Sequence, residues 1–592
     1  MIFHPILPYV HSYAWLNVRE PGRINCSLPM TSDKATEKKM QGLGKKLGTR
    51  FVSAAVMALS FAGGAQSADA PDIGHAVDSI FQDMGKPDAP GCAVGVQQGG
   101  AQPILRGYGS ADLEHNAGIT PATVFEAGSV SKQFTAASIL MLAGEGKLAL
   151  NDDVHKYIPE LPDYGERITI DELLSHTSGL RDWGDIEALG GWPRTSRIYT
   201  LKDVLDVAAR QKHLNYKPGT AYSYTNTGFN LLAIIVERVS TKTLAQFSHE
   251  RLFEPLKMSH TQWRDDFRRV VKDRAIAYQQ KDGVSRQLMP FEDAYGNGGL
   301  LTTVGDLLRW NAALTEGELG SFVTTEIQRQ THLDTGHSIA YARGLFVETY
   351  QGVREIAHGG ATAGYRAWLG RYPDQHLSIA VLCNTGNANA PLLAHKVAAL
   401  FLPAEPASPP IVPPTQDLAT RAGLYVDLRM GMPLRLEVRS GALSIVDGPA
   451  LVALSPTEFR AGTTIFRFQG DDRVTRETAD GDILEYRRTP VWQPTSRDLM
   501  SFAGEFKSEE AMASYRVTIK NNAVIIAPED RLGEELILHP IFADSFEFAD
   551  DNVAGVLHFS RDSKGKVSGF EMSDPRVRAL GFHRIGGSSP LH

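Results

Sequence analysis

The sequence predicts an α/β domain followed by two small antiparallel β-barrel domains, and three observations lead to this fold class. The chain has 592 residues, too many for one ordinary hydrophobic core, so two or three domains are expected. Before about residue 400, strand-like segments lie at both ends of a long helical middle. A proline-rich stretch then leads into a region of short alternating segments that contains an internal repeat.

The first domain is expected over residues 71–402. It opens with a helix at residues 76–84, and the helical run at residues 231–239 belongs to its middle. Its strand-like segments are 93–96, 104–108, 345–349 and 368–372. Strands at both ends of a helical cluster imply one sheet built from distant parts of the chain.

Prolines dominate residues 403–416, which predicts a stiff, extended linker. Beyond the linker, residues 417–425 match residues 498–506 as an internal repeat. Each copy is followed by alternating segments with turn residues between them, as expected for antiparallel β-barrels or sandwiches. We therefore predict one β-barrel domain over residues 417–495 and a second over residues 496–592.

The N-terminal region has the features of a secretory signal at residues 40–67. Lys45, Lys46 and Arg50 precede a short apolar stretch, which is followed by small residues suited to cleavage. We expect an exported protein, periplasmic or secreted, and we interpret residues 1–39 as a gene-start extension. No later apolar run reaches the roughly 20 residues of a membrane span, so no integral membrane segment is expected in the mature chain.

The segment from Phe125 to Phe134 contains the motif Ser129-x-x-Lys132 at the start of an apolar helix. Positions i and i+3 share one face of a helix, so Lys132 is expected to lie over Ser129. A serine hydroxyl is a poor nucleophile unless a neighbouring base takes its proton, and a desolvated lysine can be that base. The motif alone is weak, because chains of this size contain several by chance.

Two further motifs follow in order, Tyr224-x-Asn226 and then His358-Gly359-Gly360. Ser-x-x-Lys, Tyr-x-Asn and Lys/His-x-Gly together form the active-site set of the penicillin-recognising serine hydrolases. The chain therefore resembles the family of class C β-lactamases, DD-peptidases and D-aminopeptidases over about residues 75–400. Framework segments that also look like this family are 108–112, 168–180, 298–303 and 372–374.

This resemblance implies a β-lactamase-like domain with an antiparallel sheet flanked by helices, an all-helical lobe, and the active site between them. The domain plan is closest to a bacterial D-aminopeptidase, in which two small β-barrels follow the catalytic domain. The resemblance also makes the strands that carry Cys92 and Cys383 near neighbours. A disulfide would then be feasible, but we favour two buried thiols, neither of them catalytic.

The resemblance assigns catalytic roles to three residues. Ser129 is the nucleophile that forms an acyl-enzyme, and an N-cap role for its hydroxyl is compatible with this. Lys132 accepts the serine proton or holds Tyr224 in a basic state. Tyr224 delivers a proton to the leaving group, and we prefer it to Tyr222 because only Tyr224 has an asparagine two positions later.

Four further residues are expected to bind the substrate. Asn226 can accept a hydrogen bond from the lysine and donate its side-chain amide to a substrate carbonyl. His358 stands where class C β-lactamases have lysine, although a purely structural strand histidine is the alternative. Gly360 lets the strand backbone approach the substrate, and the N–H groups of Ser129 and Ala361 are the expected oxyanion donors. We interpret His176, in the framework, as a residue that turns and caps a helix.

One departure from the family bears on the substrate. Gly359 and Ala361 stand where related β-lactamases and DD-peptidases offer hydroxyls that bind a substrate carboxylate. Thr362 is the nearest hydroxyl, and in a regular strand it points to the opposite face. This favours a D-aminopeptidase, amidase or esterase over a β-lactamase or DD-carboxypeptidase.

The preferred function is an exported serine hydrolase that cleaves amide or ester bonds of small substrates, most like a D-aminopeptidase. A carboxylesterase is second and a β-lactamase third, and a penicillin-binding sensor with little turnover is the alternative of another class. The net charge of −8 and the lack of a basic block argue against nucleic acid as a partner. No metal-binding motif and no phosphate-binding loop is visible, so neither a metal nor a cofactor is expected. The sequence leaves the oligomeric state open.

Overall fold

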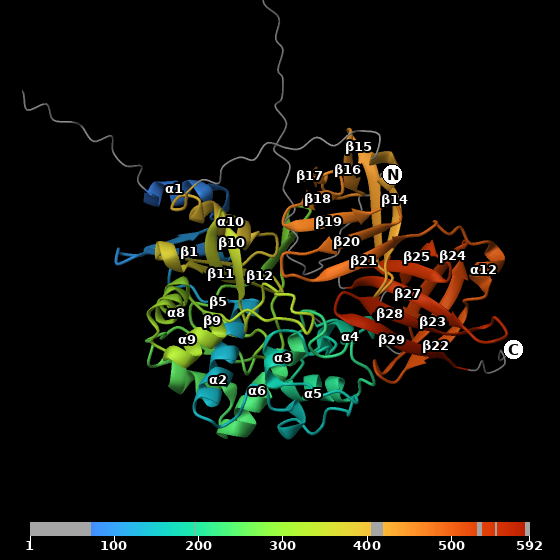
Figure 1. Cartoon of the computed structure of the whole chain (residues 1–592). Coiled ribbons are helices and arrows are strands. Elements are labelled where there is room, and N and C mark those ends of the chain that lie inside the picture. Colours follow the sequence, from blue (N-terminus) through green and yellow to red (C-terminus); the bar gives the residue numbers. More distant parts are fainter. Residues whose placement is uncertain (1–72, 195, 404–417, 530–534, 551–552, 586–592) are drawn as a thin grey trace, which may run out of the picture. The chain divides into compact units, whose positions relative to one another are not determined.

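The computed structural model describes residues 73–592 except 195, 404–417, 530–534, 551–552 and 586–592 (Figure 1). The predicted gene-start extension, the predicted signal peptide and almost all of the predicted linker lie outside the described residues. Within the described ranges, no helix combines the length and apolar character needed to cross a bilayer.

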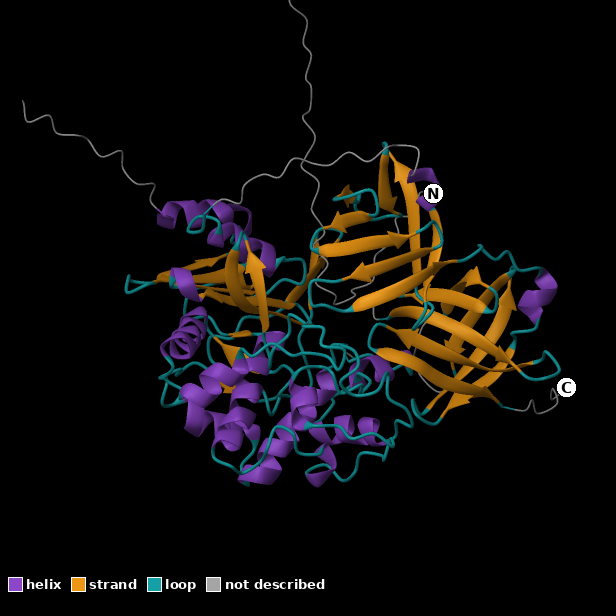
Figure 2. Ribbon diagram, viewed as in Figure 1, coloured by secondary structure: helices purple, strands orange, loops and turns teal. Residues whose placement is uncertain are grey.

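A six-stranded antiparallel sheet forms the centre of the first domain (Figure 2). Its strands are β1 (Cys92–Gln98), β2 (Ile104–Tyr108), β10 (Phe346–Tyr350), β11 (Val353–Thr362), β12 (Tyr365–Tyr372) and β13 (Leu377–Cys383). The strand order β10-β11-β12-β13-β1-β2 places the start of the domain beside its end. The expectation of one sheet built from distant segments is thereby confirmed.

Helices cover both faces of this sheet. The N-terminal and C-terminal helices of the domain share a core with one face, in which Val77, Val94 and Leu393 are buried. The other face packs against the helical lobe, whose central helix α2 is largely buried and mostly apolar. The helices are α1 (Ile73–Ile80), α2 (Lys132–Gly144), α3 (Ile170–Leu174), α4 (Trp183–Leu189), α5 (Leu201–Ala209), α6 (Asn226–Ser240), α7 (Leu244–Ser248), α8 (Val304–Glu316), α9 (Ser321–Ile327) and α10 (Ala390–Ala398).

Short elements complete the domain. The 3-10 turns are η1 (Gln82–Met84), η2 (Gly128–Ser131), η3 (Val154–Lys156) and η5 (Pro373–Gln375), and η4 (His249–Phe253) is a π-helical turn. The minor strands are β3 (Ser110–Asp112), β4 (Ala117–Gly118), β5 (Phe125–Glu126), β6 (Gln262–Trp263), β7 (Tyr278–Lys281), β8 (Val284–Gln287) and β9 (Leu300–Thr302). The helix expected at residues 76–84 begins earlier, at Ile73, and its last part is the separate turn η1.

A disulfide joins Cys92 to Cys383. The two residues lie directly opposite each other where β1 pairs with β13, so the thiols meet across the strands. The expectation of two free buried thiols was therefore wrong. Neighbouring strands could be anticipated from the family resemblance, but the register that aligns these two cysteines could not.

The C-terminal region consists of two eight-stranded antiparallel sheets, the first nearly closed and the second a closed barrel. The first contains β14 (Gly423–Asp427), β15 (Pro433–Arg439), β16 (Ala442–Ile445), β17 (Val452–Ala453), β18 (Glu458–Ala461), β19 (Thr464–Gln469), β20 (Arg473–Glu477) and β21 (Ile483–Arg488). The second contains β22 (Gly504–Ser508), β23 (Ala513–Lys520), β24 (Ala523–Pro528), β25 (Leu536–Phe542), β26 (Ser545–Ala549), β27 (Ala554–Arg561), β28 (Val567–Asp574) and β29 (Val577–Arg584). Their side chains alternate between core and solvent, as the sequence pattern predicts.

The internal repeat marks the start of each barrel. In both copies a short helix, α11 (Leu418–Arg421) or α12 (Ser496–Met500), precedes the first strand of its sheet. The second barrel shares a hydrophobic core with Trp183 and Leu189 of α4. A buried ion pair of 2.9 Å between Arg181 and Glu510 reinforces this contact. The second barrel is thus attached to the helical lobe beside the segment that leads to α4.

Candidate active site

Ser129 lies in the 3-10 turn η2, immediately before α2 begins at Lys132. Gly128 precedes it with a φ of 52°, a conformation that glycine adopts without strain. In a 3-10 turn the side chains at i and i+3 eclipse each other, and Lys132 Nζ lies 3.1 Å from Ser129 Oγ. The residue at the N-cap of η2 is Ala127, so the hydroxyl of Ser129 is not used as a helix cap and remains available.

Lys132 is completely buried, and three acceptors surround its amine. Besides Ser129 Oγ, these are Asn226 Oδ1 at 3.0 Å and the backbone oxygen of Asn297 at 2.7 Å. A neutral amine has two N–H bonds and one lone pair. When its N–H groups donate to Asn226 and Asn297, the lone pair is left to accept the hydroxyl proton of Ser129.

Electrostatics favour this neutral form. Burial lowers the pKa of Lys132 well below its usual value, and the positive charge of Arg576 lowers it further. The carboxylate of Asp182 acts in the opposite direction, and Arg194 adds to the lowering. A buried lysine whose ammonium form is disfavoured can serve as a base near neutral pH.

The Tyr-x-Asn segment leads directly into α6. Thr225 caps this helix by accepting from the backbone N–H of Thr227, while Asp182 Oδ2 accepts from the backbone N–H of Asn226 at 2.5 Å. The ring of Tyr224 lies with its centroid 4.8 Å from Lys132 Nζ. Tyr222 belongs to a buried cluster with Ile339, Tyr341 and Phe346, against which Tyr224 also packs; of the two tyrosines, Tyr224 is the one whose ring lies beside the lysine.

Strand β11 passes close to η2 where Gly360 of the strand lies against Gly128 of the turn. A Cβ atom built on Gly128 would lie 2.6 Å from the backbone N of Ala361, and one built on Gly360 would lie 3.2 Å from the backbone N of Ser129. Only residues without a side chain permit this approach. The backbone N–H groups of Ser129 and Ala361 are thereby brought close to each other beside the serine hydroxyl.

His358 lies on the same strand with its ring almost fully buried, at 1% exposure. Nδ1 donates to the backbone oxygen of Gly359 at 2.6 Å, and Nε2 accepts from the hydroxyl of Tyr341 at 3.2 Å. Burial, together with the nearby charge of Lys132, lowers the pKa of His358 to about 3. The ring is therefore neutral, and it supplies no positive charge where class C β-lactamases have lysine.

His176 follows the C-cap of α3 in a left-handed conformation, with a φ of 59°. Its Nδ1 accepts from the backbone N–H of Thr225 at 3.2 Å, and its ring lies 4.2 Å from that of Tyr224. His176 thus turns the chain after the helix and also holds the Tyr-x-Asn segment in place through its contacts with Thr225 and Tyr224.

The site contains a residue from the second barrel that the sequence did not reveal. Arg576 lies in the loop between β28 and β29, and its guanidinium is 5.3 Å from the centroid of the Tyr224 ring. Its Nε is 3.8 Å from Asp185 Oδ2, and its backbone oxygen accepts from Asn215 Nδ2 at 2.7 Å. No sequence pattern singles out this loop or this arginine.

Other groups around the site were also not predicted. The backbone oxygen of Asn297 accepts from Lys132, and the carboxylate of Asp182 accepts from the backbone N–H of Asn226. The hydroxyl of Tyr341 contacts His358. Asn297 directly precedes a segment that was identified only as framework. Among the described residues, the one cluster able to offer three metal ligands is Asp112, Glu114 and His115, and none of these belongs to the site.

The comparison with protein families identifies this arrangement. The family model described as Beta-lactamase matches residues 77–401, more than half of the chain. The chain belongs to the Beta-lactamase family. It is accordingly a serine hydrolase of the β-lactamase and penicillin-binding protein type, as its sequence motifs indicated.

Individual relatives agree with this assignment. A D-aminopeptidase from Cereibacter sphaeroides is 28% identical over 468 residues, which are 77% of this chain and 87% of that protein. A D-aminopeptidase from Brucella canis is 26% identical over 546 residues, 87% of this chain and 99% of that protein. The octameric penicillin-binding protein homologue from Pyrococcus abyssi has the same fold, with a TM-score of 0.51, 24% identity, and coverage of 79% of this chain and 100% of that chain.

Proposed function

We propose that this serine hydrolase cleaves amide bonds of small peptides or amides through an acyl-Ser129 intermediate, as a D-aminopeptidase does. The observation that carries the proposal is the environment of Lys132. Its neutral amine can donate to Asn226 and to Asn297, which leaves the lone pair of the amine to accept the proton of Ser129. The D-aminopeptidases that match most of the chain support the choice of substrate, because their similarity extends through the barrel region.

In the acylation step, Ser129 Oγ attacks the substrate carbonyl while Lys132 Nζ accepts its proton. The negative charge that develops on the carbonyl oxygen is stabilised by the N–H groups of Ser129 and Ala361. Asn226 Oδ1 is occupied by the lysine, so its Nδ2 group is oriented to donate to a carbonyl of the substrate. The leaving nitrogen then takes a proton from Tyr224, and Lys132, which lies beside the Tyr224 ring, returns a proton to the tyrosine.

Deacylation runs through the same groups. Water attacks the acyl-Ser129 ester and loses a proton to the Tyr224–Lys132 pair, and the oxyanion donors stabilise the second tetrahedral intermediate. Free acid is released and the serine hydroxyl is restored. The reaction needs no group beyond these side chains and water.

The third motif supports a substrate without a carboxylate beside the scissile bond. His358 is neutral, and Gly359 and Ala361 have no hydroxyl, so a carboxylate placed there would lose its hydration without gaining a partner. β-Lactams and DD-peptidase substrates carry such a carboxylate. This chemistry favours peptidase, amidase or esterase substrates.

We also propose that the protein is exported. The predicted signal at residues 40–67 is the first argument. The second is the disulfide between Cys92 and Cys383, because structural disulfides persist in oxidising compartments such as the periplasm.

The function is tested by turnover of the purified protein beside Ser129→Ala, with Ser138→Ala as the matched control. Ser138 lies on α2 with its hydroxyl bonded to the backbone oxygen of Phe134, away from the proposed chemistry. The substrates are D- and L-alanine p-nitroanilide, p-nitrophenyl butyrate and nitrocefin. We expect D-selective anilide release that Ser129→Ala abolishes and Ser138→Ala retains.

Each other outcome identifies a competing function. Ester cleavage alone would make the protein a carboxylesterase, and rapid nitrocefin hydrolysis would make it a β-lactamase. Stoichiometric acylation without turnover would indicate a penicillin-binding sensor. Anilide release that Ser129→Ala leaves unchanged would refute the proposed nucleophile.

A further inference from the structure

Residues 181–183 connect the second barrel to the first turn of α6. The buried side chain of Arg181 donates to the carboxylate of Glu510 at 2.9 Å and to the backbone oxygen of Arg578 at 2.7 Å. Both partners belong to the second barrel, Glu510 in the loop after β22 and Arg578 in β29. Trp183 is buried in the hydrophobic core that this barrel shares with α4. The segment is therefore held to the barrel at both of its ends.

Thr227, in the first turn of α6, holds the same segment against the helix. Its buried hydroxyl donates to the backbone oxygen of Arg181 at 2.7 Å and accepts from the backbone N–H of Trp183 at 2.8 Å. Between these two residues, Asp182 directs one carboxylate oxygen to the backbone N–H of Asn226 at 2.5 Å. The other oxygen accepts from the first turn of α4. The segment thus fixes the start of α6, where the Tyr-x-Asn motif ends.

Asp182 determines the place of the first acceptor of Lys132. Asn226 is the first residue of α6, and its Oδ1 accepts from Lys132 Nζ at 3.0 Å. Hydrogen bonds from a backbone N–H to a carboxylate are short and strong because they are charge-assisted. The bond from Asn226 to Asp182 therefore fixes the backbone from which the asparagine side chain reaches the lysine.

Trp183 determines the place of the second acceptor through Asn230, which lies one turn into α6. The indole N–H of Trp183 donates to Asn230 Oδ1 at 3.0 Å. Asn230 Nδ2 in turn donates to the backbone oxygen of Tyr295 at 2.9 Å and to Asn297 Oδ1 at 2.8 Å, so both N–H donors of this buried amide have partners. The backbone oxygen of Asn297 is the second acceptor of the catalytic lysine, at 2.7 Å.

We propose that Asp182 and Trp183 are positioning residues for Lys132, each holding one acceptor of its amine. With both N–H bonds of the neutral amine directed to these acceptors, the lone pair faces Ser129. The proposal rests on the proposed function, because Lys132 is the base of that reaction. It gives the second barrel a role in catalysis, since Arg181 attaches the positioning segment to the barrel.

Asp182 also acts on Lys132 through its charge. Burial and the positive charge of Arg576 lower the pKa of Lys132, the carboxylate of Asp182 raises it, and Arg194 adds a smaller lowering. Removal of the carboxylate therefore lowers the pKa of Lys132 further, and the neutral amine persists to lower pH. The rise of kcat/KM with pH should then move to lower pH, opposite to the shift expected when the charge of Arg576 is removed.

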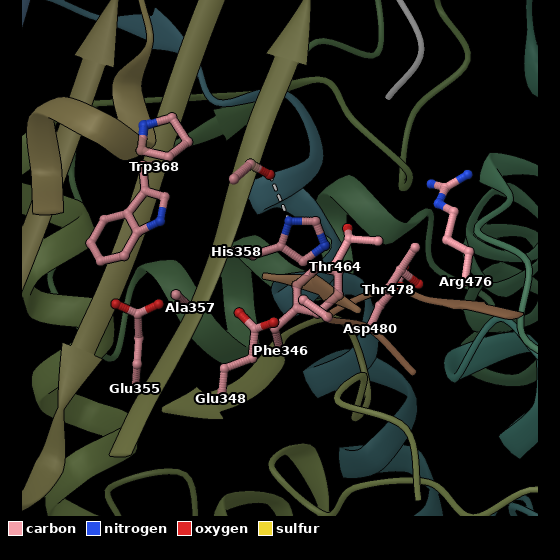
Figure 3. A pocket seen from close by; sticks show the side chains of 13 residues that line it. Phe346, Glu348, Glu355, Ala357, His358, Trp368, Thr464, Arg476, Thr478 and Asp480 are labelled. Carbon is pink, nitrogen blue, oxygen red and sulfur yellow. Dashed lines mark hydrogen bonds between the residues drawn. The ribbon is translucent and has the colours of Figure 1, made fainter. Parts of the chain in front are cut away.

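Two histidines beside Lys132 do not add to this pH dependence. His176 follows α3, and His358 lies on β11, where its ring donates to the backbone oxygen of the next residue (Figure 3). Burial lowers the pKa of both rings, that of His358 to about 3. Both rings are therefore uncharged near neutral pH. The remaining titratable neighbour is Tyr224, whose ring lies beside the lysine.

Two further carboxyl groups face Arg576. Asp185 Oδ2 on α4 lies 3.8 Å from Arg576 Nε, and Asp574 ends β28. Burial raises the pKa of Asp185 to about 7 and also raises that of Asp574. The charge of Asp182 contributes to the raised pKa of Asp185, so its removal moves the ionisation of Asp185 to lower pH as well. The shifts of Lys132 and Asp185 therefore have the same direction.

The hydrogen-bond part of the proposal is tested with Trp183→Phe, which removes the indole N–H and keeps a ring in the core. Trp263→Phe is the matched control, because Trp263 is also buried and its indole N–H donates to the Ser248 hydroxyl. A lost buried hydrogen bond corresponds to about tenfold in rate. We expect kcat for D-alanine p-nitroanilide to fall about tenfold in Trp183→Phe, with KM retained, and to stay at the wild-type value in Trp263→Phe. An unchanged kcat in Trp183→Phe, or an equal fall in both variants, would overturn the proposal.

The role of Asp182 is tested by pH–rate profiles of Asp182→Asn and Asp306→Asn. Asp306 is the matched control, a buried carboxylate that accepts from the backbone N–H of His260 at 2.9 Å. In Asp182→Asn we expect the plateau of kcat/KM to fall about tenfold and its rise to move to lower pH. Both should be unchanged in Asp306→Asn. A profile of Asp182→Asn that keeps the wild-type pH dependence, or moves to higher pH, would overturn the assignment of Asp182.

A readout that does not depend on the substrate separates this proposal from the proposed function. Phenylmethanesulfonyl fluoride labels an activated serine: Ser129 Oγ bonds to sulfur, fluoride leaves, and Lys132 takes the hydroxyl proton. The rate of labelling, followed by intact-protein mass spectrometry, should fall about tenfold in Trp183→Phe and not in Trp263→Phe. Failure of the wild type to turn over D-alanyl substrates would refute the proposed function, whereas equal labelling rates in the two variants would refute the positioning role.

Discussion

Gly360 is the position where the smallest change in the sequence should most disturb the catalytic geometry. A Cβ atom at this position would lie 2.0 Å from the backbone oxygen of Ala127, and real Cβ contacts are essentially never shorter than 3.0 Å. In Gly360→Ala the two backbones must therefore separate by about 1 Å, since neither contact atom belongs to a flexible side chain. This movement separates β11 from η2 and so displaces the N–H of Ala361 from that of Ser129.

The expected effect follows from this displacement. A misplacement of about 1 Å costs on the order of a hundredfold in rate, or about 2.7 kcal/mol in transition-state stabilisation. Overpacking also destabilises the fold by about 1–3 kcal/mol. We expect kcat/KM for D-alanine p-nitroanilide to fall about a hundredfold in Gly360→Ala. The fall should appear mainly in kcat, because the oxyanion forms only in the transition state.

The assay is steady-state kinetics of Gly360→Ala beside Gly118→Ala, with circular dichroism and thermal unfolding of both variants. Gly118 is an exposed strand residue whose added Cβ would meet no atom within 4 Å. Gly118→Ala should therefore retain wild-type rates. A folded Gly360→Ala enzyme with kcat/KM within about threefold of the wild type would refute the assignment of these two N–H groups as the oxyanion donors.

Further predictions concern the proton-transfer groups and the disulfide. Arg576→Met removes a positive charge near Lys132 and so raises the pKa of this lysine. Because the neutral amine is the active form, the rise of kcat/KM in a pH–rate profile should move to higher pH. A move to lower pH, or no move, would contradict this coupling. Tyr224→Phe should lower amide turnover by about a hundredfold, because it removes the proposed proton donor. Tyr222→Phe, in the buried cluster against which Tyr224 packs, should retain the wild-type rate. Equal losses in the two variants would contradict the assignment of Tyr224 as the proton donor. Cys92→Ala should lower the free energy of unfolding by about 2–4 kcal/mol in urea titrations, and a reductant should weaken the wild type but not the variant.

The sequence was most informative where a local pattern has a local physical cause. The i, i+3 spacing of Ser129 and Lys132 requires only that the chain turn helically there, and either an α-helix or the observed 3-10 turn brings the two together. The alternating segments after each repeat copy similarly predict strands, because a pleated strand places successive side chains on opposite faces.

Contacts between distant segments could not be predicted in this way. Arg576 reaches Tyr224 only because the second barrel packs on α4, and that packing depends on side chains spread over the whole barrel. The disulfide depends on strand register, which a shift of one residue would change completely. Long-range packing and register are properties of the assembled sheet and have no short sequence signature.

The proposed acyl-Ser129 intermediate can be observed directly by intact-protein mass spectrometry after rapid acid quench with D-alanine p-nitrophenyl ester. Acylation by such an activated ester is fast, so the acyl-enzyme should accumulate before water removes it. The account predicts a mass increase of one alanyl group in the wild type, mapped to the peptide that contains Ser129 and absent from Ser129→Ala. Steady turnover of the ester with no adduct on that peptide, or an adduct that persists in Ser129→Ala, would contradict it.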